Sequence, residues 1–374
     1  MYRIPLMSPS LSGNEEKYIQ DVIRSTWIGG SGAYIERFER EWAEICGVNE
    51  SVSTFNGTVA LHLALLAMGA GHGDEVIVPA MTYVATANAV RYTGAEPVFI
   101  DIDPNTWCMD PMKIEDSITR RTKGIMPVHL HGHPADMDPI IKIAGLYKLW
   151  IVCDAAQAHM ATYKGRQVGS LGDIETFSFH VGKIFTCGEG GAITLNDSRL
   201  AKWLRMVRSH GMDPERRFFH PMTAFNYRMT NMQASVLCAQ IERRDNILEQ
   251  RRNIFKRYEN NLNGVDGISF QPIAEWISPC PWVFSIIINE KECGFSRDQL
   301  ITELSDKGIE SRPFYFPLHK LPQYRELSVR RGDLCPEAER LSQVGIFLPS
   351  STDLTENDLD YVCEAVRDIS KIHR

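Results

Sequence analysis

A single lysine, Lys183, stands between an aromatic run and a glycine-rich turn in the stretch FSFHVGKIFTCGEGGAITLND, residues 177–197. Two kinds of chemistry use a lysine in such a place. Beside glycines, a Gly-Lys pair can bind the phosphates of a nucleotide. At the mouth of a sheet, partial loss of solvent lowers the pKa of a lysine, which can then act as a covalent catalyst. The two hypotheses predict different enzymes.

The spacing around Lys183 argues against the nucleotide-phosphate hypothesis. The phosphate loop GxxxxGK[ST] requires a glycine five places before Gly182, where Phe177 stands, and a Ser or Thr after the lysine, where Ile184 stands. The dinucleotide fingerprint GxGxxG is also absent, because the first strand-to-helix turn reads NGT. An NAD-dependent oxidoreductase is therefore disfavoured.

An anion site is predicted at the turn NGT, residues 56–58, which precedes an apolar run with helical character. The first turn of a helix has free backbone N–H groups and the positive end of the helix dipole, which together favour an anion such as a phosphate monoester. An ordinary helix cap would have the same sequence. Asn56, Gly57 and Thr58 therefore become informative only in combination with other residues.

A carboxylate, an amide and an amine complete that combination. Asp154 ends the apolar run LWIVCD and Gln157 follows three residues later, while Ser178 lies near the end of a predicted strand, ETFSF, and Lys183 follows that strand. Asp154 could pair with a buried cation or cap the next helix. A pyridoxal 5'-phosphate enzyme needs three such groups: a phosphate anchor, a carboxylate that pairs with the ring nitrogen, and an amine that forms a Schiff base.

Three histidines alternate in the run HLHGH, namely His129, His131 and His133. Alternate side chains lie on one face of a strand, so a metal site is one hypothesis. Hydrogen-bonded histidines at the end of a strand are the other. No acidic or cysteine cluster lies nearby in the sequence to complete a coordination shell, so we favour the second hypothesis and expect no metal.

These side chains need a framework that brings them to one place. From residue 56 onward, buried apolar runs alternate with helical patterns, which predicts an α/β fold with a mostly parallel sheet covered on both faces. In such sheets ligands lie outside the carboxyl ends of the strands, where Asp154 is expected. The expected elements are a helix over 85–92, a strand over 97–103, a helix near 112–118, a strand over 124–130, a helix near 139–147 and strands over 149–154 and 175–179.

The pattern changes after residue 197 to long helices. The second of them, over residues 231–262, is long enough to act as a strut that leaves the first domain. A strand over 282–289, a helix over 296–308, an extended segment over 312–319 and a helix over 355–369 follow. We predict a large cofactor-binding domain of residues 1–245, which includes the N-terminal segment, and a smaller α+β domain of residues 246–374.

The composition excludes several classes of protein. The chain has 374 residues, of which 44% are hydrophobic and 23% charged, and its formal net charge of -7 argues against nucleic acid as a partner. Nine cysteines occur singly without a CxxC pair, which fits a reducing compartment. No run of about 18 apolar residues occurs, so no membrane span is predicted. We expect a cytoplasmic protein.

Seven blocks of the chain resemble, in the same order, those of the DegT/DnrJ/EryC1/StrS sugar aminotransferases. The blocks read NGTVALHLALLAMGAGHGDEVIVPAMTYVATANAV, PVFIDIDPNTWCMD, PVHLHGHPADMD, DAAQAH, GSLGDIETFSFHVGKIFTCGEGGAITLND, FNYRMTNMQA and ESRPFYFPLHKLPQY. The resemblance implies a fold type I aminotransferase with a seven-stranded type of sheet. It also implies a homodimer whose active sites are shared between the subunits.

The resemblance also implies roles for individual residues. Lys183 falls on the lysine that forms the Schiff base with pyridoxal 5'-phosphate, and Asp154 on the carboxylate that pairs with its pyridine nitrogen. Further cofactor contacts are expected from Gln157 near the ring oxygen, Tyr83 stacked on the ring, Gly57, Thr58 and Ser178 at the phosphate, and Asn226 at the phosphate of the neighbouring subunit. Residues expected near a sugar nucleotide are His180, Glu189, Arg228, Arg312 and His319.

The implied reaction is a transamination from L-glutamate to a nucleotide-linked 4-keto-6-deoxy sugar. Some relatives are dehydratases with histidine in place of this lysine, so Lys183 favours the transaminases. Residues 4–41 and 310–324 are most similar to members that convert GDP-4-keto-6-deoxymannose to GDP-perosamine. The stretches SFHVGK and DAAQA are closer to 4-aminotransferases of UDP or dTDP sugars. Amination at C3 and a non-catalytic, cofactor-binding regulator are the remaining alternatives.

Overall fold

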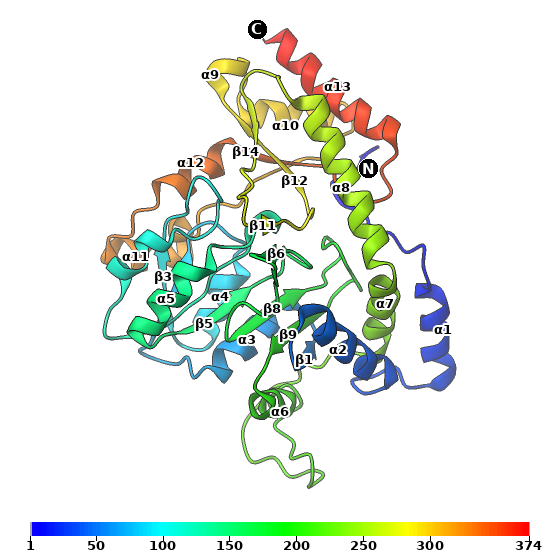
Figure 1. Ribbon diagram of the computed structural model, residues 1–374, viewed down its shortest axis with the longest axis vertical. Coiled ribbons are helices and arrows are strands. Elements are labelled where there is room, and N and C mark those ends of the chain that lie inside the picture. Colours follow the sequence, from blue (N-terminus) through cyan, green and yellow to red (C-terminus); the bar gives the residue numbers. More distant parts are fainter. Residues whose placement is uncertain (1, 374) are drawn as a thin grey trace.

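A seven-stranded sheet forms the centre of the larger part of the molecule (Figure 1). The computed structural model describes residues 2–373. Strand β9 runs antiparallel to both of its neighbours, and the other neighbouring pairs are parallel, so the prediction of a mostly parallel sheet is confirmed. In spatial order the strands are β1 (Glu50–Thr54), β9 (Gly191–Leu195), β8 (Ile174–Ser178), β5 (Trp150–Asp154), β4 (Thr122–Ile125), β2 (Glu75–Pro79) and β3 (Glu96–Ile100).

Helices cover this sheet on both faces. Strands β2, β8 and β9 are buried at every position, which requires that side chains on either face lie under other elements. A strand over residues 175–179 was predicted where β8 lies, and EVIVP of β2 and GAITL of β9 are equally short, buried runs. The helices of this part are α1 (Glu15–Ser25), α2 (Ala33–Cys46), α3 (Gly57–Ala67), α4 (Ala85–Tyr92), α5 (Met137–Tyr147) and α6 (Ser198–Val207).

The C-terminal part has its own antiparallel sheet and its own hydrophobic core. The strands are β10 (Ile268–Phe270), β12 (Phe284–Ile288), β14 (Gly345–Leu348) and β13 (Arg312–Pro313), in this order. The second core packs Phe284, Leu300 and Val366 together with Ile4 from the other end of the chain. The helices around this second core are α9 (Glu290–Cys293), α10 (Arg297–Asp306) and α13 (Glu356–Ile372). The helices α11 (Pro322–Arg331) and α12 (Pro336–Val344) belong to the same stretch of sequence, but their buried side chains pack in the first core.

Two consecutive helices join the two parts, as Figure 1 shows. Helix α7 (Asn231–Glu242) ends at Arg243, where α8 (Arg244–Leu262) begins, so the predicted single strut is in fact two helices. Ile247 and Leu248 of α8 pack in the first core, whereas Ile254 packs in the second. We retain a division into domains at residues 245 and 246 as a proposal supported by this change of core.

Two other elements differ from the prediction. The helix expected near residues 112–118 is wrong, because the chain forms two short 3-10 turns there, Pro111–Lys113 and Glu115–Ser117. Asp110 accepts the N–H of Met112 and so caps the first turn, and Ile118 is already extended. The strand expected over 124–130 ends at Ile125. Leu130–Gly132 then forms a 3-10 turn in which His131 has a left-handed conformation, with φ of 51°.

A third, small sheet ties the C-terminal part to the large one. It contains β11 (Ile277–Ser278), β6 (Thr162–Tyr163) and β7 (Arg166–Gln167). Just after β11, the N–H of Cys280 donates to the carbonyl of Gly132 at 2.9 Å. Gly132 has φ of 92°, and a Cβ there would lie 1.9 Å from the Cys280 carbonyl oxygen, so only glycine allows this approach. Among residues 2–373, no helix is both long and apolar enough to span a bilayer.

Candidate active site

The carboxyl ends of neighbouring strands bring the predicted residues to one edge of the large sheet. Asp154 is the last residue of β5 and Ser178 the last of β8, and the two strands are parallel partners. Gly57, which opens α3 after β1, lies against Ser178, because a Cβ on Gly57 would be 2.6 Å from the Cβ of Ser178. Lys183 follows β8 by five residues. These four residues are therefore assembled at the position where ligands of α/β sheets bind.

The carboxylate of Asp154 is held by two donors in a nearly buried position, with 6% of the residue exposed. The hydroxyl of Thr86, in the first turn of α4, donates to one oxygen at 2.7 Å. The N–H of Ala156 donates to the other at 3.1 Å. The side chain of Asp154 therefore has a fixed orientation at the sheet edge, which is what a partner for a single ring nitrogen requires.

Lys183 is half-buried in the turn after β8, where its N–H donates to the carbonyl of His180 at 2.8 Å. Burial lowers the pKa of Lys183 to about 8, although the charge of Asp154 acts in the opposite direction. The side-chain nitrogen lies 4.5 Å from the centre of the Trp282 ring. Near neutral pH a useful fraction of this lysine is thus the free amine, which is the nucleophilic and basic form.

The start of α3 provides a cradle for an anion. The side chain of Asn56 accepts the N–H of Val59 at 3.0 Å, as expected of a cap. Within residues 2–373, the N–H groups of Gly57 and Thr58 donate to no acceptor. The hydroxyl of Ser178 stands beside them, and its one hydrogen bond is a long contact of 3.4 Å from the N–H of His180. Two free N–H groups, a hydroxyl and the helix dipole fit a phosphate monoester.

Gln157 and Tyr83 line the region next to Asp154. The side-chain oxygen of Gln157 accepts the N–H of His131 at 2.9 Å, which leaves its amide nitrogen to donate toward the hydroxyl of Tyr315 at 3.4 Å. Tyr83 is 57% exposed, and its ring centre lies 6.0 Å from that of Tyr315. Burial raises the pKa of Tyr315, so this hydroxyl keeps its proton. An exposed aromatic face beside a fixed amide suits a flat ring as ligand.

The predicted substrate contacts are spread more widely. His180 and Glu189 face each other across the mouth of the lysine turn at 3.8 Å, both about half exposed. Arg228 donates to the hydroxyl of Ser209 at 3.0 Å. Arg312 is exposed and pairs with the carboxylate two residues before it at 2.6 Å. No contact joins Arg228 or Arg312 to the cluster of Lys183 in the part of the chain that the structure describes.

His319 and Asn226 have contrasting environments. His319 is buried, and its Nε2 lies 3.0 Å from a carboxylate oxygen of a glutamate in α12, so the ring is directed toward that helix. Asn226 is exposed on the segment between α6 and α7. Its placement is compatible with a contact to a second subunit and does not bring it to Ser178 of its own chain.

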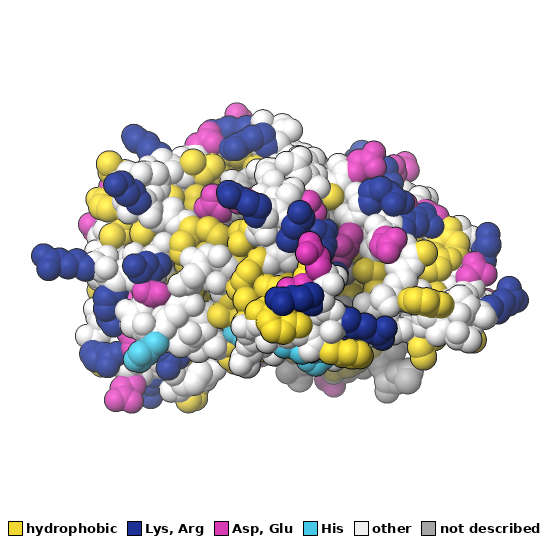
Figure 2. Space-filling model, turned by 90° about the horizontal axis from the view of Figure 1, so that it is seen from below, with side chains coloured by type: hydrophobic (Ala, Val, Ile, Leu, Met, Phe, Trp, Pro, Cys, Tyr) yellow, Lys and Arg dark blue, Asp and Glu magenta, His cyan; other side chains and the backbone are white. Residues whose placement is uncertain are grey.

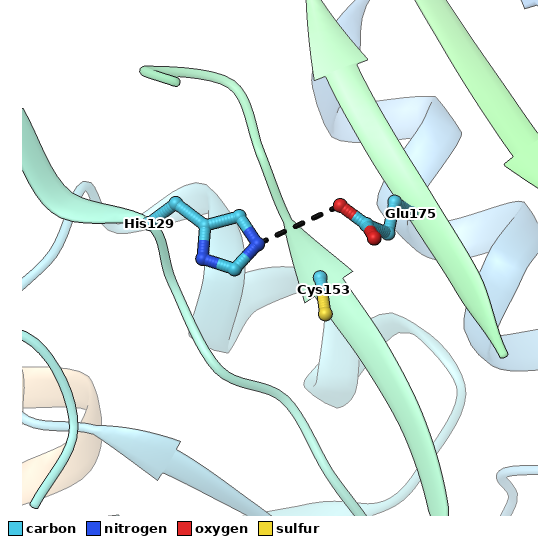
Figure 3. A group of neighbouring side chains, drawn as sticks. All are labelled: His129, Cys153 and Glu175. Carbon is cyan, nitrogen blue, oxygen red and sulfur yellow. Dashed lines mark ion pairs between the residues drawn. The ribbon is translucent and has the colours of Figure 1, made fainter. Parts of the chain in front are cut away.

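The run HLHGH is not a strand, so its three histidines have separate surroundings. His133 accepts the N–H of Ala274 at 3.3 Å and lies against Trp276. His131 is enclosed by aromatic rings, and burial lowers its pKa to about 3. Only His129 lies among other metal-ligating side chains, those of Cys153 and Glu175, and all three are buried (Figure 3).

The tautomer of His129 bears on metal binding at this cluster. Its Nδ1 accepts the N–H of Ala135 at 3.0 Å and therefore carries no proton. A neutral ring then has its proton on Nε2, the atom that faces Glu175 at 3.5 Å and that a metal would need. Glu175 in turn accepts the N–H groups of Gly169, Leu171 and Gly172. Glu175 is thus the hydrogen-bonded centre of the cluster, whereas Nε2 of His129 makes no hydrogen bond within residues 2–373.

Three residues of the site were not predicted from sequence: Thr86, Trp282 and Tyr315. Thr86 lies within the block MTYVATANAV and Tyr315 within RPFYFPLH, so the blocks pointed to their segments but not to their roles. Thr86 contacts Asp154 across 68 residues, and Trp282 lies 100 residues from Gly182, to which it donates. Contacts over such separations leave no local pattern in the sequence.

A lysine amine, an oriented carboxylate and a phosphate cradle at one edge of an α/β sheet fit pyridoxal 5'-phosphate. Asp154 would hold the ring nitrogen, Gly57, Thr58 and Ser178 the phosphate, and Lys183 the carbonyl carbon. The observation that tests this fit is the close approach of Gly57 to Ser178: a Cβ on residue 57 would fill the phosphate cradle, and the glycine present leaves it open. Fold and site together define a pyridoxal-phosphate enzyme of fold type I.

Comparisons with known proteins narrow this class. The model of the DegT/DnrJ/EryC1/StrS aminotransferase family matches residues 9–367, and the chain belongs to this family. It is therefore a pyridoxal-phosphate-dependent aminotransferase. The chain is 46% identical to the GDP-perosamine synthase of Caulobacter vibrioides over 365 residues, which cover 97% of each chain. It is 41% identical to that of Escherichia coli O157:H7, over 98% of this chain and 99% of the relative.

Solved structures agree with the family. DesV from S. venezuelae superposes with a TM-score of 0.91 at 35% identity, covering 99% of each chain. The PLP-form of Spr1654 from Streptococcus pneumoniae gives a TM-score of 0.92 at 30% identity and covers 100% of each chain. The expected fold type I architecture and its cofactor are thereby confirmed.

Proposed function

We propose that this enzyme transfers the amino group of L-glutamate to C4 of GDP-4-keto-6-deoxymannose and so forms GDP-perosamine. The observation that carries the proposal is the near-complete coverage of this chain by three GDP-perosamine synthases, at 38% to 46% identity. The half-buried Lys183 with a pKa of about 8 supports the transamination itself. Amination of a UDP- or dTDP-linked sugar, or at C3, is the alternative that the test below separates.

The cofactor defines the task of the protein side chains. When bound, pyridoxal phosphate supplies a carbonyl carbon for amines and a pyridine ring that accepts the electron pair left when a neighbouring C–H bond breaks. Asp154, fixed by Thr86, favours the protonated ring nitrogen through its negative charge. The free N–H groups of Gly57 and Thr58 and the hydroxyl of Ser178 anchor the phosphate and set the depth of the ring.

Lys183 moves the protons. In the first half-reaction its free Nζ takes the proton from the α-carbon of glutamate and passes it to the carbonyl carbon that the bound cofactor would supply. In the second it takes a proton from that carbon and delivers it to C4 of the sugar. A group with a pKa of about 8 can do both near neutral pH, because neither protonation state is scarce. Since one amine serves one face of the ring, proton delivery from that face sets the configuration at C4.

We also propose that the chain forms a homodimer in which both copies contribute residues to each active site. The segment between α6 and α7 projects from the body at the bottom of Figure 1. It exposes Phe218 and Phe219, over which Arg217 and Arg216 lie at 5.0 and 3.9 Å. On the face seen in Figure 2, hydrophobic side chains are interspersed with arginines and lysines. Asn226 on this segment would reach the phosphate of the second copy.

The remaining expectations stand as parts of the same proposal. His180, Glu189, Arg228, Arg312 and His319 are proposed to lie near the sugar nucleotide once the second copy is in place. No disulfide joins cysteines within residues 2–373, which supports action in the reducing cytoplasm. Nucleic acid and membranes are not proposed as partners.

The test has two steps. The purified, yellow protein is first mixed with L-glutamate, and loss of the colour is expected. Colour that persists would contradict transamination and favour the hypothesis of a non-catalytic, cofactor-binding regulator. The glutamate-treated protein is then given GDP-, UDP- and dTDP-linked 4-keto-6-deoxy sugars, and the product masses are compared. Conversion of the GDP sugar to its amine supports the proposal, whereas faster conversion of a UDP or dTDP sugar contradicts it.

A further inference from the structure

Trp282 is the point at which the C-terminal part touches the catalytic lysine. It lies between β11 and β12, is 5% exposed, and its carbonyl accepts from Arg251 of α8 at 3.0 Å. Its indole N–H donates to the carbonyl of Gly182 at 2.8 Å. Its ring face lies 4.5 Å from the side-chain nitrogen of Lys183. One side chain thus binds both the backbone of the lysine turn and the lysine amine.

The two contacts have different chemistry. The hydrogen bond to Gly182 fixes the carbonyl directly before Lys183 and hence the point from which the lysine side chain starts. The ring face attracts an ammonium ion and has little attraction for a neutral amine. Burial acts in the opposite direction, because it penalises the charged form. The indole therefore offers the amine a place in which it can be protonated inside a desolvated site.

Trp282 and Asp154 are the groups beside Lys183 that favour its ammonium form, because the cysteine and the two histidines described next are neutral. Burial raises the pKa of Cys280 to about 12, and burial together with the charge of Lys183 lowers the pKa values of His131 and His159 to about 3. All three are neutral between pH 6 and 9. The charge of Asp154 raises the pKa of Lys183, and the buried Arg251 of α8 lines the same small cavity as the lysine.

We propose that Trp282 is a positioning residue for Lys183, which receives the lysine amine on its ring face whenever the amine is not joined to the cofactor. The inference rests on the proposed function only in that the parked amine is the proton carrier of transamination. In the first half-reaction the amine accepts a proton from carbon, and the ammonium so formed is the species that an indole face stabilises. That proton would then pass to the carbonyl carbon of the cofactor, and in the second half-reaction the amine takes a proton back from this carbon and delivers it to the sugar carbon.

Two variants separate the two contacts. Trp282→Phe keeps an aromatic face and loses the N–H donor to Gly182, while Trp282→Leu loses both. Trp276→Leu is the matched control, because Trp276 lies in the same connecting segment and packs against His133 and Tyr163 away from the lysine. Circular dichroism and gel filtration establish which variants fold, and Trp282→Phe keeps the inference testable if Trp282→Leu does not.

The first measurement needs neither cofactor nor sugar. The full-length protein is stripped of pyridoxal phosphate, and the rate at which Lys183 reacts with an amine-specific reagent is followed by mass spectrometry between pH 6 and 10. We expect the midpoint for Lys183 to fall by about 0.5 to 1 pH unit in Trp282→Leu, because the ammonium loses the ring face. Trp282→Phe should lie between wild type and Trp282→Leu, and Trp276→Leu should match wild type. An unchanged or higher midpoint in Trp282→Leu, or no change in Trp282→Phe when Trp282→Leu is unfolded, overturns the inference.

The second measurement uses the loaded enzyme. We expect Trp282→Phe to lower kcat about five-fold with little change in KM for the sugar, because loss of one hydrogen bond loosens the lysine and not the sugar site. A change confined to KM contradicts the inference. The two failures remain distinct: a wild type that aminates no sugar defeats the proposed function, while the titration of Lys183 still decides the role of Trp282.

Discussion

Two groups of polar side chains occupy the same pair of strands, β5 and β8, and they differ in which of their hydrogen-bonding groups lack a partner. Asp154 and Ser178 lie at the strand ends on one face, together with Lys183. Cys153 and Glu175 are partners across the same two strands and lie on the other face, because neighbouring residues of a strand point to opposite sides. His129 completes the second group (Figure 3).

The difference lies in what each group leaves unpaired. Around the first group, the N–H groups of Gly57 and Thr58 have no acceptor within residues 2–373, and the lysine amine contacts only a ring face and distant charges. In the second group, Glu175 accepts three backbone N–H groups and faces His129. Unpaired N–H groups at the sheet edge make a ligand site, whereas a buried carboxylate that accepts three backbone N–H groups holds a loop in place.

The largest expected effect separates the two groups outright. Lys183→Ala should lower kcat for amination by about 10⁴-fold or more, because no other amine can carry the proton, while the fold stays intact. Lys164→Ala is the control, since that lysine forms an exposed ion pair with Asp138 at 2.5 Å. Product is quantified by mass spectrometry with each purified protein. Amination retained by Lys183→Ala would refute the assigned role.

A smaller loss is expected when only the charge at the strand end is removed. Asp154→Asn keeps the shape of the side chain but offers an uncharged partner to the ring, so kcat should fall by about 10²- to 10³-fold. Because the charge of Asp154 raises the pKa of Lys183, the titration midpoint of that lysine should also fall below about 8. Asp138→Asn, which disrupts the same surface ion pair, should change neither quantity. A normal kcat for Asp154→Asn would contradict the proposed pairing of Asp154 with the ring nitrogen of the cofactor.

Much of the fold was predictable because its signals are local. The strands β5 and β8 and the helix over 85–92 were predicted within a few residues. The failures occurred where competing signals are short: a proline and a capping aspartate turned residues 110–118 into 3-10 turns. Helices α11 and α12 were not predicted, because their sequences are mostly polar and their packing is decided by distant partners.

The candidate site was predictable in part for a different reason. Asp154, Ser178 and Lys183 follow strands, and the carboxyl ends of parallel strands meet at one edge, so their assembly could be inferred. The roles of Thr86 and Trp282 could not, because each depends on a contact across 68 or 100 residues. The period-two argument for HLHGH failed because His131 adopts a left-handed turn conformation that ends the strand pattern.

The cradle of the first group can be filled by one methyl group. Gly57→Ala places a Cβ 2.6 Å from the Cβ of Ser178, so the serine must shift and the phosphate loses part of its space. We expect the Kd for pyridoxal phosphate to rise about ten-fold, with kcat at saturating cofactor much less affected. Gly71→Ala is the matched control, since a Cβ there has no neighbour within 4 Å. Equal cofactor affinity in both variants, measured by titration of the stripped proteins, would contradict the cradle.

The smallest catalytic effect is expected from the second group. Glu175→Gln replaces one accepting oxygen by an amide nitrogen among the N–H groups of Gly169, Leu171 and Gly172, so the free energy of unfolding should fall by about 1–3 kcal/mol. Exposed Glu44→Gln provides the control in urea unfolding. Activity per cofactor-loaded site should stay within about two-fold of wild type, because the cluster lies on the face of β5 and β8 away from Lys183. If the wild type instead retains one zinc ion per chain after dialysis and Glu175→Gln does not, then His129, Cys153 and Glu175 form a metal centre. The contrast between the two groups would then be wrong.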